Sequence, residues 1–297
     1  TAWEWLVSDG KPSLTALSLA VILLTLAAML AALSGIGRGI RWLSNLNMAL
    51  SWLLLVIFIV FGATAFAGEM FVGGLTEYLR AIPAMSITIW DGGDTPTAQA
   101  LSDWQSAWTI FYWAWWIAFT PFVGLFLARV SQGRTIREYV VGAILLPAMM
   151  CFAWFCIVGG TALDLELTGT ADGTILGADL SAQLFATAEN LFAADWVLPV
   201  ATLCVVLLIT YLVTSADSAV LVINTIVSGG ATDGIRTRHI VLWSVLLGLV
   251  IITLLFAGGM DALRSVMIIG ALPFSAVMLF MLCALVYALW QDSRSVN

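Results

Sequence analysis

Residues 104–129 read WQSAWTIFYWAWWIAFTPFVGLFLAR, an apolar segment in which five of the chain's 14 tryptophans fall within thirteen positions. At 3.6 residues per turn, one face of this predicted helix carries four aromatic rings, those of Tyr112, Trp115, Trp116 and Phe119. Trp104 and Trp108 lie near the start of the segment, as is typical of tryptophans in a membrane-interface belt. Trp115 and Trp116 lie a turn or more deeper, which favours a binding site.

Four aromatic rings on one helical face suit a quaternary ammonium ligand. Such a ligand carries a full positive charge but has no N–H to donate, so ordinary hydrogen bonds cannot hold it. The faces of aromatic rings attract it, at roughly 0.5–2 kcal/mol per ring depending on desolvation. Packing against a neighbouring helix or lipid is the competing interpretation, because an aromatic face alone is a lining more often than a cation site.

The composition indicates an all-α integral membrane protein. Of the 297 residues, 62% are hydrophobic and 10% are charged, and the mean hydropathy is +1.04. The apolar runs are continuous and reach the roughly 20 residues that a helix needs to cross about 30 Å of hydrocarbon, whereas barrel strands would alternate. The net charge of −7 gives no support to a nucleic-acid partner.

The side chains also argue against an enzyme or a metal centre. Four cysteines lie in apolar segments without metal-ligand or disulfide spacing, namely Cys151, Cys156, Cys204 and Cys283. His239 is the only histidine, so the chain has no histidine cluster or histidine-based triad. No pairing of a nucleophile with a base suggests catalysis. A seven-span retinal protein is excluded because Lys11, the only lysine, lies in a loop.

The hydropathy pattern predicts seven membrane spans. They are about Leu14–Leu33, Met48–Phe66, Trp108–Leu127, Tyr139–Ala162, Trp196–Val222, Ile240–Phe256 and Val266–Trp290. Residues 69–102 are too polar to span, and within them residues 75–90, LTEYLRAIPAMSITIW, are predicted to form an interfacial helix.

Basic residues predict the orientation. Eight of the 11 lie in alternate connections and in the C-terminal tail, namely Arg38, Arg41, Arg129, Arg134, Arg137, Arg236, Arg238 and Arg294. By the positive-inside rule these segments are cytoplasmic, so residue 1 lies outside and the C-terminus inside, in a multi-pass protein of the plasma membrane. Residues 1–12 lead directly into a span without a targeting segment, from which we expect earlier spans in the natural protein.

The fifth span contains a polar cluster, TYLVTSADSAVLVINT, at residues 210–225. Thr214 and Ser218 lie one turn apart and Ser215 adjoins them, so two or three neutral oxygens can converge on a small hard cation such as sodium. Hydroxyls in membrane helices more often bond to their own backbone or to a neighbouring helix. Asp217 is a candidate functional residue because an ionisable group within a span is costly, although a structural bond to another helix or to a cytoplasmic arginine is equally open.

Three segments resemble signatures of the betaine/choline/carnitine transporter family. They are residues 108–116 (WTIFYWAWW) with 121–124 (PFVG), Arg129, 133–134 (GR) and 136–138 (IRE); residues 214–218 (TSADS); and residues 34–40 (SGIGRGI) with 43–45 (LSN). The matches follow the family's order, and the resemblance covers nearly the whole chain from about Ala31.

The resemblance implies an inverted-repeat, LeuT-like fold, similar to that of sodium-coupled amino-acid transporters, with twelve spans in the whole protein. The seven spans here would be the sixth to the twelfth. Residues 1–68 would hold the last two helices of the first half and residues 69–103 an extracellular loop. Residues 104–291 would form the second five-helix repeat, and residues 292–297 a short cytoplasmic tail.

The resemblance also implies site residues. The aromatic cage falls on Trp115, Trp116 and Phe119, with Tyr112 on the same face and Trp108 toward the outer entrance. The sodium site falls on Thr214 and Ser215, with Tyr211 beside them, and Asp217 and Ser218 stay as coupling or structural residues. Phe119 stands where relatives often have Trp or Tyr, which leaves the substrate open.

The implied function is that of a secondary transporter that imports a zwitterionic onium osmolyte by alternating access. Glycine betaine is the first substrate candidate; choline, carnitine and dimethylsulfoniopropionate remain open. Sodium is the predicted coupling ion and no other cofactor is implied, while the predicted partners are the lipid bilayer and two further copies in a homotrimer. The alternatives are a sodium-independent exchanger, a proton-coupled carrier, and a non-transporting binding subunit or sensor. Val123, where exchangers often have methionine near the cage, favours sodium symport together with the two hydroxyls.

Overall fold

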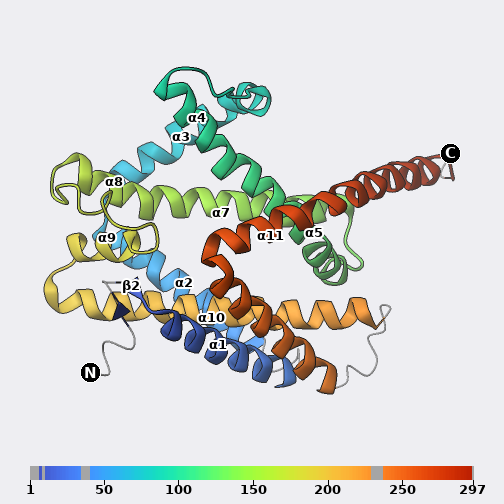
Figure 1. Ribbon diagram of the computed structural model, residues 1–297. Helices are drawn as coiled ribbons and strands as arrows, with labels where there is room; N and C mark the ends of the chain where they lie inside the picture. Colours follow the sequence, from blue (N-terminus) through green and yellow to red (C-terminus); the bar gives the residue numbers. More distant parts are fainter. Residues whose placement is uncertain (1–6, 9–10, 35–40, 229–236, 296–297) are drawn as a thin grey trace. The chain divides into compact units, whose positions relative to one another are not determined.

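The computed structural model describes residues 7–8, 11–34, 41–228 and 237–295 (Figure 1). The motif residues 35–40, which include Arg38, and the cytoplasmic Arg236 lie outside these ranges. The described elements in chain order are β1 (Val7–Ser8), β2 (Lys11–Pro12), α1 (Leu14–Ser34), α2 (Arg41–Phe61), α3 (Thr64–Ile87), α4 (Pro96–Gln105), the π-helical turn η2 (Ser106–Ile110), α5 (Phe111–Val130), α6 (Ile136–Val140), η3 (Val141–Leu145), α7 (Leu146–Trp154), η4 (Phe155–Gly159), α8 (Gly160–Leu167), α9 (Gln183–Leu191), α10 (Ala194–Val227) and α11 (Thr237–Ser295).

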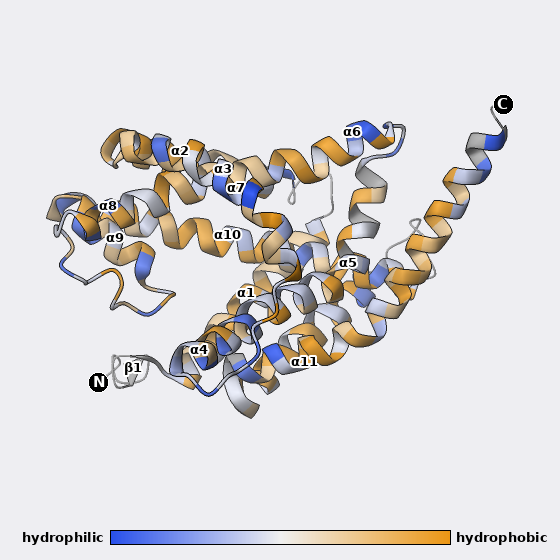
Figure 2. Cartoon of the chain, turned by 90° about the horizontal axis from the view of Figure 1, so that it is seen from above, coloured by the Kyte–Doolittle hydropathy of each residue, from blue (hydrophilic) through white to orange (hydrophobic). Residues whose placement is uncertain are grey.

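The prediction of an all-α integral membrane protein is confirmed, since the only described strands are the two-residue partners β1 and β2. Apolar residues cover most of the length of α10 and α11 (Figure 2). Within the described ranges, six helical segments are long and apolar enough to cross a membrane: Leu14–Ser34, Arg41–Phe61, Ile136–Leu167, Ala194–Val227, Thr237–Gly259 and Asp261–Gln291. They match six of the seven predicted spans. The seventh coincides with η2 and the 20-residue helix α5, which is not among the six.

The predicted end of the second span, at Phe66, is wrong. Helix α2 ends at Phe61, and Phe66 belongs to α3, which begins at Thr64. The chain turns here because the backbone N–H of Ala63 donates to the Thr161 hydroxyl at 3.2 Å, an interaction with α8, about one hundred residues later in the chain. A hydropathy profile of the sequence cannot reveal such a contact.

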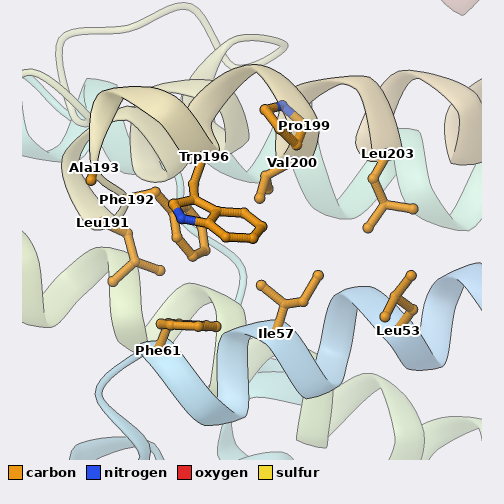
Figure 3. Close-up of a pocket in the computed structure, with 10 residues that line it drawn as sticks. All are labelled: Leu53, Ile57, Phe61, Leu191, Phe192, Ala193, Trp196, Pro199, Val200 and Leu203. Atoms are coloured by element: carbon orange, nitrogen blue, oxygen red, sulfur yellow. The ribbon is translucent and has the colours of Figure 1, made fainter.

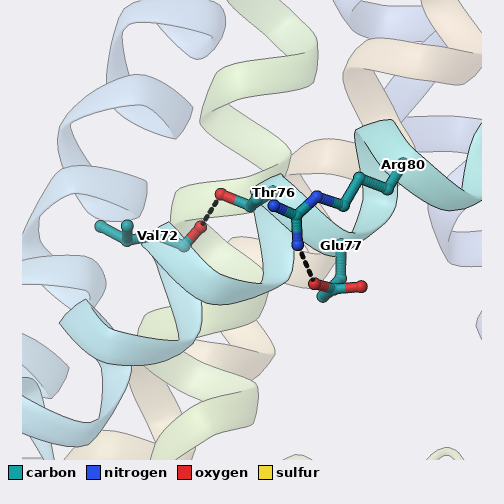
Figure 4. Close-up of polar contacts among 4 residues, drawn as sticks. All are labelled: Val72, Thr76, Glu77 and Arg80. Atoms are coloured by element: carbon teal, nitrogen blue, oxygen red, sulfur yellow. Dashed lines mark hydrogen bonds and ion pairs between the residues drawn. The ribbon is translucent and has the colours of Figure 1, made fainter.

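Helix α3 contains most of the predicted interfacial helix, which the structure ends at Ile87. Its Thr76 hydroxyl donates to the Val72 carbonyl at 2.8 Å, and Arg80 pairs with Glu77 at 2.9 Å (Figure 4). Both side chains of the ion pair are mostly exposed, so the pair contributes little stability.

The chain forms two compact units. Unit 1 comprises the described residues of Thr1–Thr25, Thr88–Val130 and Val222–Asn297, and unit 2 comprises those of Leu26–Ile87 and Ser131–Leu221. Helices α1 and α10 each contribute residues to both units. The core of unit 2 is built from α2, α9 and α10 around the buried residues Leu54, Phe58, Ala188, Val200, Cys204 and Leu207.

An apolar cavity of about 500 Å³ adjoins this core in unit 2. Leu53, Ile57 and Phe61 of α2 face Trp196, Val200 and Leu203 of α10 across it (Figure 3). The remaining lining residues are Leu191, Phe192, Ala193 and Pro199. None of these side chains can ligate a cation or bind a carboxylate through a charge, so the cavity is not where an ion or a zwitterion would be held.

Unit 2 also contains a loop organised by one carboxylate. Glu166, at the end of α8, accepts backbone hydrogen bonds from Gly173 at 2.8 Å and from Ile175 and Leu176 at 2.9 Å each. Three amide donors on one carboxylate fix the path of residues 168–176, because each bond to a charged group is stronger than a neutral one.

Unit 1 is built around the packing of α5 against α11. Helix α11 consists of two helical segments, because its backbone is non-helical at Gly258 and Gly259. Gly259 has φ 62° and ψ −136°, a conformation that only glycine adopts easily. The break lies between the predicted sixth span, which ends at Phe256, and the seventh, which begins at Val266.

Replacing Gly259 with alanine is expected to destabilise the protein by about 1–3 kcal/mol, the usual cost of a strained backbone. No atom lies within 4 Å of the Cβ position, so the cost would come from the backbone alone. The matched control is Gly270→Ala in the helical part of α11, where the Cβ position is also open and alanine is favoured. Thermal unfolding in detergent micelles would measure both, and equal unfolding temperatures would contradict the prediction.

Candidate functional site

The aromatic residues of α5 and η2 form one continuous row in unit 1. Trp108 stacks on Tyr112 with ring centroids 5.9 Å apart, Tyr112 contacts Trp115 at 5.6 Å, and Trp115 stacks on Trp116 at 6.4 Å. Trp108 lies in the π-helical turn η2, which directly precedes α5. Phe119, one turn beyond Trp115, lies on the same helical face and is 40% exposed. The four aromatic side chains that were predicted to share a face therefore do so, and Trp108 extends their row.

These rings form a wall rather than a closed box. Neighbouring ring centroids are about 6 Å apart or less, whereas a cation attracted by a ring face itself lies up to about 6 Å from one centroid. No onium group fits between adjacent rings of the row. It can instead lie against their outer faces, which are accessible: Trp116 is 59% exposed.

The aromatic row already holds one cation. The Arg264 guanidinium, on α11 in the same unit, lies 5.3 Å from the centroid of the Phe111 ring. Phe111 in turn contacts Tyr112 and Trp115, with centroids 5.7 and 6.0 Å away. A delocalised cation thus lies against a ring that contacts the middle of this row, which is the kind of interaction proposed for an onium ligand.

The polar cluster of α10 belongs to unit 2, and its hydroxyls take different partners. The Thr214 hydroxyl donates to the carbonyls of Thr210 and Tyr211, at 3.0 Å each. Ser218 donates to Asp217 Oδ1 at 3.0 Å. Ser215 is exposed and has no hydrogen-bond partner among the described residues. No hydrogen bond therefore joins the Thr214 and Ser218 hydroxyls. Thr214 and Ser215 are adjacent in the chain, and the hydroxyl oxygen of each can still accept a bond.

Asp217 is fully buried, yet only one of its oxygens has a partner. Oδ1 accepts from Ser218, and Oδ2 has no partner in the described part of the chain. It forms no ion pair with any described arginine, so the predicted arginine partner is not seen there. A buried, half-satisfied carboxylate is unusual, so Asp217 stays a candidate functional residue.

Two side chains of α2 complete the cluster, and the sequence analysis missed both. Asn47 Nδ2 donates to the Thr214 hydroxyl at 3.0 Å, and Ser51 lies 2.8 Å from the Tyr211 hydroxyl. Both residues are buried. The signal in the sequence was their spacing: two polar residues lie about one turn apart in the apolar segment NMALSWLLL, as Tyr211 and Thr214 do in α10.

A sequence comparison decides which family the chain represents. The model of the betaine/carnitine/choline family transporters matches residues 7–294. The chain belongs to this family. It is a family of transporters rather than enzymes, and its members act on small onium solutes within a membrane.

Characterised relatives of the betaine/carnitine/choline family differ in substrate. The chain is 36% identical to the glycine betaine transporter OpuD of Bacillus subtilis over 277 residues, which are 93% of the chain and 52% of the relative. It is 38% identical to the ectoine/hydroxyectoine transporter of Virgibacillus pantothenticus, over 84% of the chain and 48% of the relative. It is 35% identical to the osmo-independent choline transporter BetT1 of Acinetobacter baylyi, over 98% of the chain and 55% of the relative.

The chain spans about half the length of these relatives. Similar identities to carriers of a betaine, an ectoine and a choline mean that similarity alone does not select the substrate.

Proposed function

We propose that the complete protein is a sodium-coupled carrier that imports a zwitterionic quaternary ammonium solute, with glycine betaine as the first candidate. The observation that carries the proposal is the accessible row of rings from Trp108 to Trp116 in a chain of the betaine/carnitine/choline family. Relatives named for glycine betaine and for choline are 36% and 35% identical to this chain, over 93% and 98% of its length.

The aromatic wall suits the onium end of the substrate. A trimethylammonium group offers methyl hydrogens that carry the positive charge, and it presents them to the outer faces of Tyr112, Trp115, Trp116 and Phe119. Each ring contributes roughly 0.5–2 kcal/mol, and the contribution rises as water is excluded. A second wall is needed to enclose the group, and we assign it to parts of the complete protein outside unit 1.

Sodium is the proposed coupling ion, held by Thr214 and Ser215 with Tyr211 beside them. Neutral hydroxyl oxygens suit sodium because the site then needs no unpaired carboxylate in hydrocarbon. One sodium ion that crosses 100 mV provides about 2.3 kcal/mol, which supports a roughly fiftyfold gradient of solute before the sodium concentration difference is counted.

A proton-coupled carrier is the second candidate, and one observation favours it. Asp217 is buried with an unpartnered oxygen, and such a carboxylate can take up a proton and donate it to a neighbouring acceptor. Sodium-independent exchange, and a sensor or binding subunit that does not transport, are further outcomes of the transport measurement.

We further propose the family arrangement for the complete protein. Twelve spans would form the LeuT-like inverted repeat, with residue 1 of this chain outside, the C-terminus in the cytoplasm and three copies assembled in the plasma membrane. Arg134 directly precedes the capping box formed by Thr135 and Glu138 at the start of α6, and Arg137 lies within it; both arginines support the cytoplasmic placement of that turn.

Recognition of the positive charge can be tested with a carbon isostere. Glycine betaine and 3,3-dimethylbutanoate have the same shape, but carbon replaces the charged nitrogen in the second. If several rings attract the cation, the isostere is expected to bind at least about a hundredfold more weakly to the purified protein. Calorimetric titration at saturating sodium would measure this, with choline, carnitine and ectoine as further ligands; equal affinities for the isosteres would contradict the proposal.

A further inference from the structure

The hydrogen bonds at Thr214 can be assigned without ambiguity. A threonine hydroxyl has one hydrogen and two lone pairs. Its hydrogen is directed to the carbonyls of Thr210 and Tyr211, so the hydroxyl must accept the bond that Asn47 Nδ2 makes at 3.0 Å. One lone pair of Thr214 remains free for a further partner.

The amide oxygen of Asn47 is also unused. Asn47 is 5% exposed, and its Oδ1 is buried without a partner among the described residues. Buried amide oxygens are almost always satisfied, so an orphan indicates a missing partner. This oxygen and the Nδ2 that contacts Thr214 are bonded to the same carbon, so both belong to one small planar group between α2 and α10.

A cation is the partner that both atoms fit. Each offers a lone pair and neither offers a hydrogen, which excludes an anion. Amide carbonyls and hydroxyls are typical oxygen ligands of small hard cations. Ser215, adjacent in the chain and without a hydrogen-bond partner in the described residues, supplies a third oxygen of the same kind.

Tyr211 has a different task. The Ser51 hydroxyl donates to the backbone carbonyl of Asn47 at 2.6 Å. The Tyr211 hydroxyl is therefore the donor in its 2.8 Å bond with Ser51. This bond lies one turn from the pair formed by Asn47 and Thr214. It joins α2 to α10 and helps to set the position along the two helices at which Asn47 contacts Thr214.

From these contacts we infer that Asn47 is a ligand of the coupling cation, so that α2 and α10 build the site together, while Tyr211 and Ser51 brace the two helices. The inference rests on the proposed sodium coupling and extends it to a residue outside α10. A sodium ion bound in this way would cross-link the two helices through Asn47, Thr214 and Ser215.

The test is the sodium dependence of glycine betaine uptake by the complete protein in proteoliposomes. Asn47→Ala is expected to raise the sodium concentration for half-maximal uptake at least about tenfold, while the KM for glycine betaine at saturating sodium stays within about twofold. The matched control is Asn45→Ala, which removes the same kind of side chain from an exposed position on α2 and is expected to shift the sodium dependence less than about twofold. Asn47→Asp keeps the ligand oxygens and is expected to restore most of the sodium affinity.

A binding measurement keeps the test decisive if Asn47→Ala does not transport. Sodium, but not potassium, is expected to raise the unfolding temperature of the purified wild type, and Asn47→Ala is expected to lose this sodium-specific rise while Asn45→Ala keeps it. Unchanged sodium dependence in Asn47→Ala, or an equal shift in Asn45→Ala, would overturn the role of Asn47 and leave sodium coupling in place. A wild type indifferent to sodium would overturn both.

Discussion

Replacing Trp116 with leucine is expected to weaken glycine betaine binding about thirtyfold. The indole is 59% exposed and stacks on Trp115 with ring centroids 6.4 Å apart, so leucine would remove an accessible aromatic face without opening a buried core. A desolvated cation–π contact contributes about 2 kcal/mol, which corresponds to this factor. Trp116→Tyr keeps an aromatic face and is expected to lose much less. Calorimetric titration of the purified protein at saturating sodium would give the dissociation constants.

Trp113 provides the matched control for this substitution. It lies on the same helix, is 68% exposed, and makes no ring contact with Tyr112, Trp115 or Trp116 among the described residues. Trp113→Leu removes the same surface area and is expected to change the dissociation constant less than about twofold. Equal losses in Trp113→Leu and Trp116→Leu would mean that the helix, rather than the ring face, had been perturbed.

Replacing Gly62 with alanine is expected to destabilise the fold by about 3 kcal/mol or more, because the new methyl group has no space. Its Cβ would overlap both the Phe58 carbonyl oxygen and Thr161 Oγ1. The first of these is backbone and cannot swing away. Thr161 is fully buried and holds the corner between α2 and α3 through Ala63, so moving it would break that corner as well. Thermal unfolding and the yield of monodisperse protein in detergent would report the loss.

Two further variants show whether the loss comes from the corner. Gly68→Ala lies in α3 with no atom within 4 Å of its Cβ position, so it is expected to be neutral or slightly stabilising. The double variant Gly62→Ala with Thr161→Ala removes one of the two clashes and is expected to regain part of the stability. A Gly62→Ala protein as stable as Gly68→Ala would show that the corner is not packed as described.

Hydropathy predicted the helices well because a membrane span is a local property of composition. Six predicted spans correspond to apolar helices in the structure, and the break at Gly258 and Gly259 lies between the predicted sixth and seventh spans. The corner after Phe61 was misplaced because it depends on Thr161, a residue far away in the sequence. Three π-helical turns, η2, η3 and η4, have no signal that we read in the sequence.

The candidate site was predictable in part for the same reason. The rings of α5 share a face because helical periodicity alone places them there. The partners of Thr214 and Tyr211 on α2 depend on how two helices meet, and polar spacing in each helix hints at that pairing only once both are considered together. The role of Glu166, which organises its loop through three backbone donors, was not predicted because it depends on the path of the loop.

The central claim is that the complete protein moves an onium solute with sodium. Its most direct test is the accumulation of labelled glycine betaine in proteoliposomes with an inward sodium gradient, compared with equal ionic strength in potassium and with a sodium ionophore. With the sodium gradient, we expect the internal concentration of glycine betaine to exceed the external one by about tenfold or more. The glycine betaine gradient is expected to collapse when the ionophore is added. Accumulation that is the same in potassium, or no uptake of any onium solute, would contradict it.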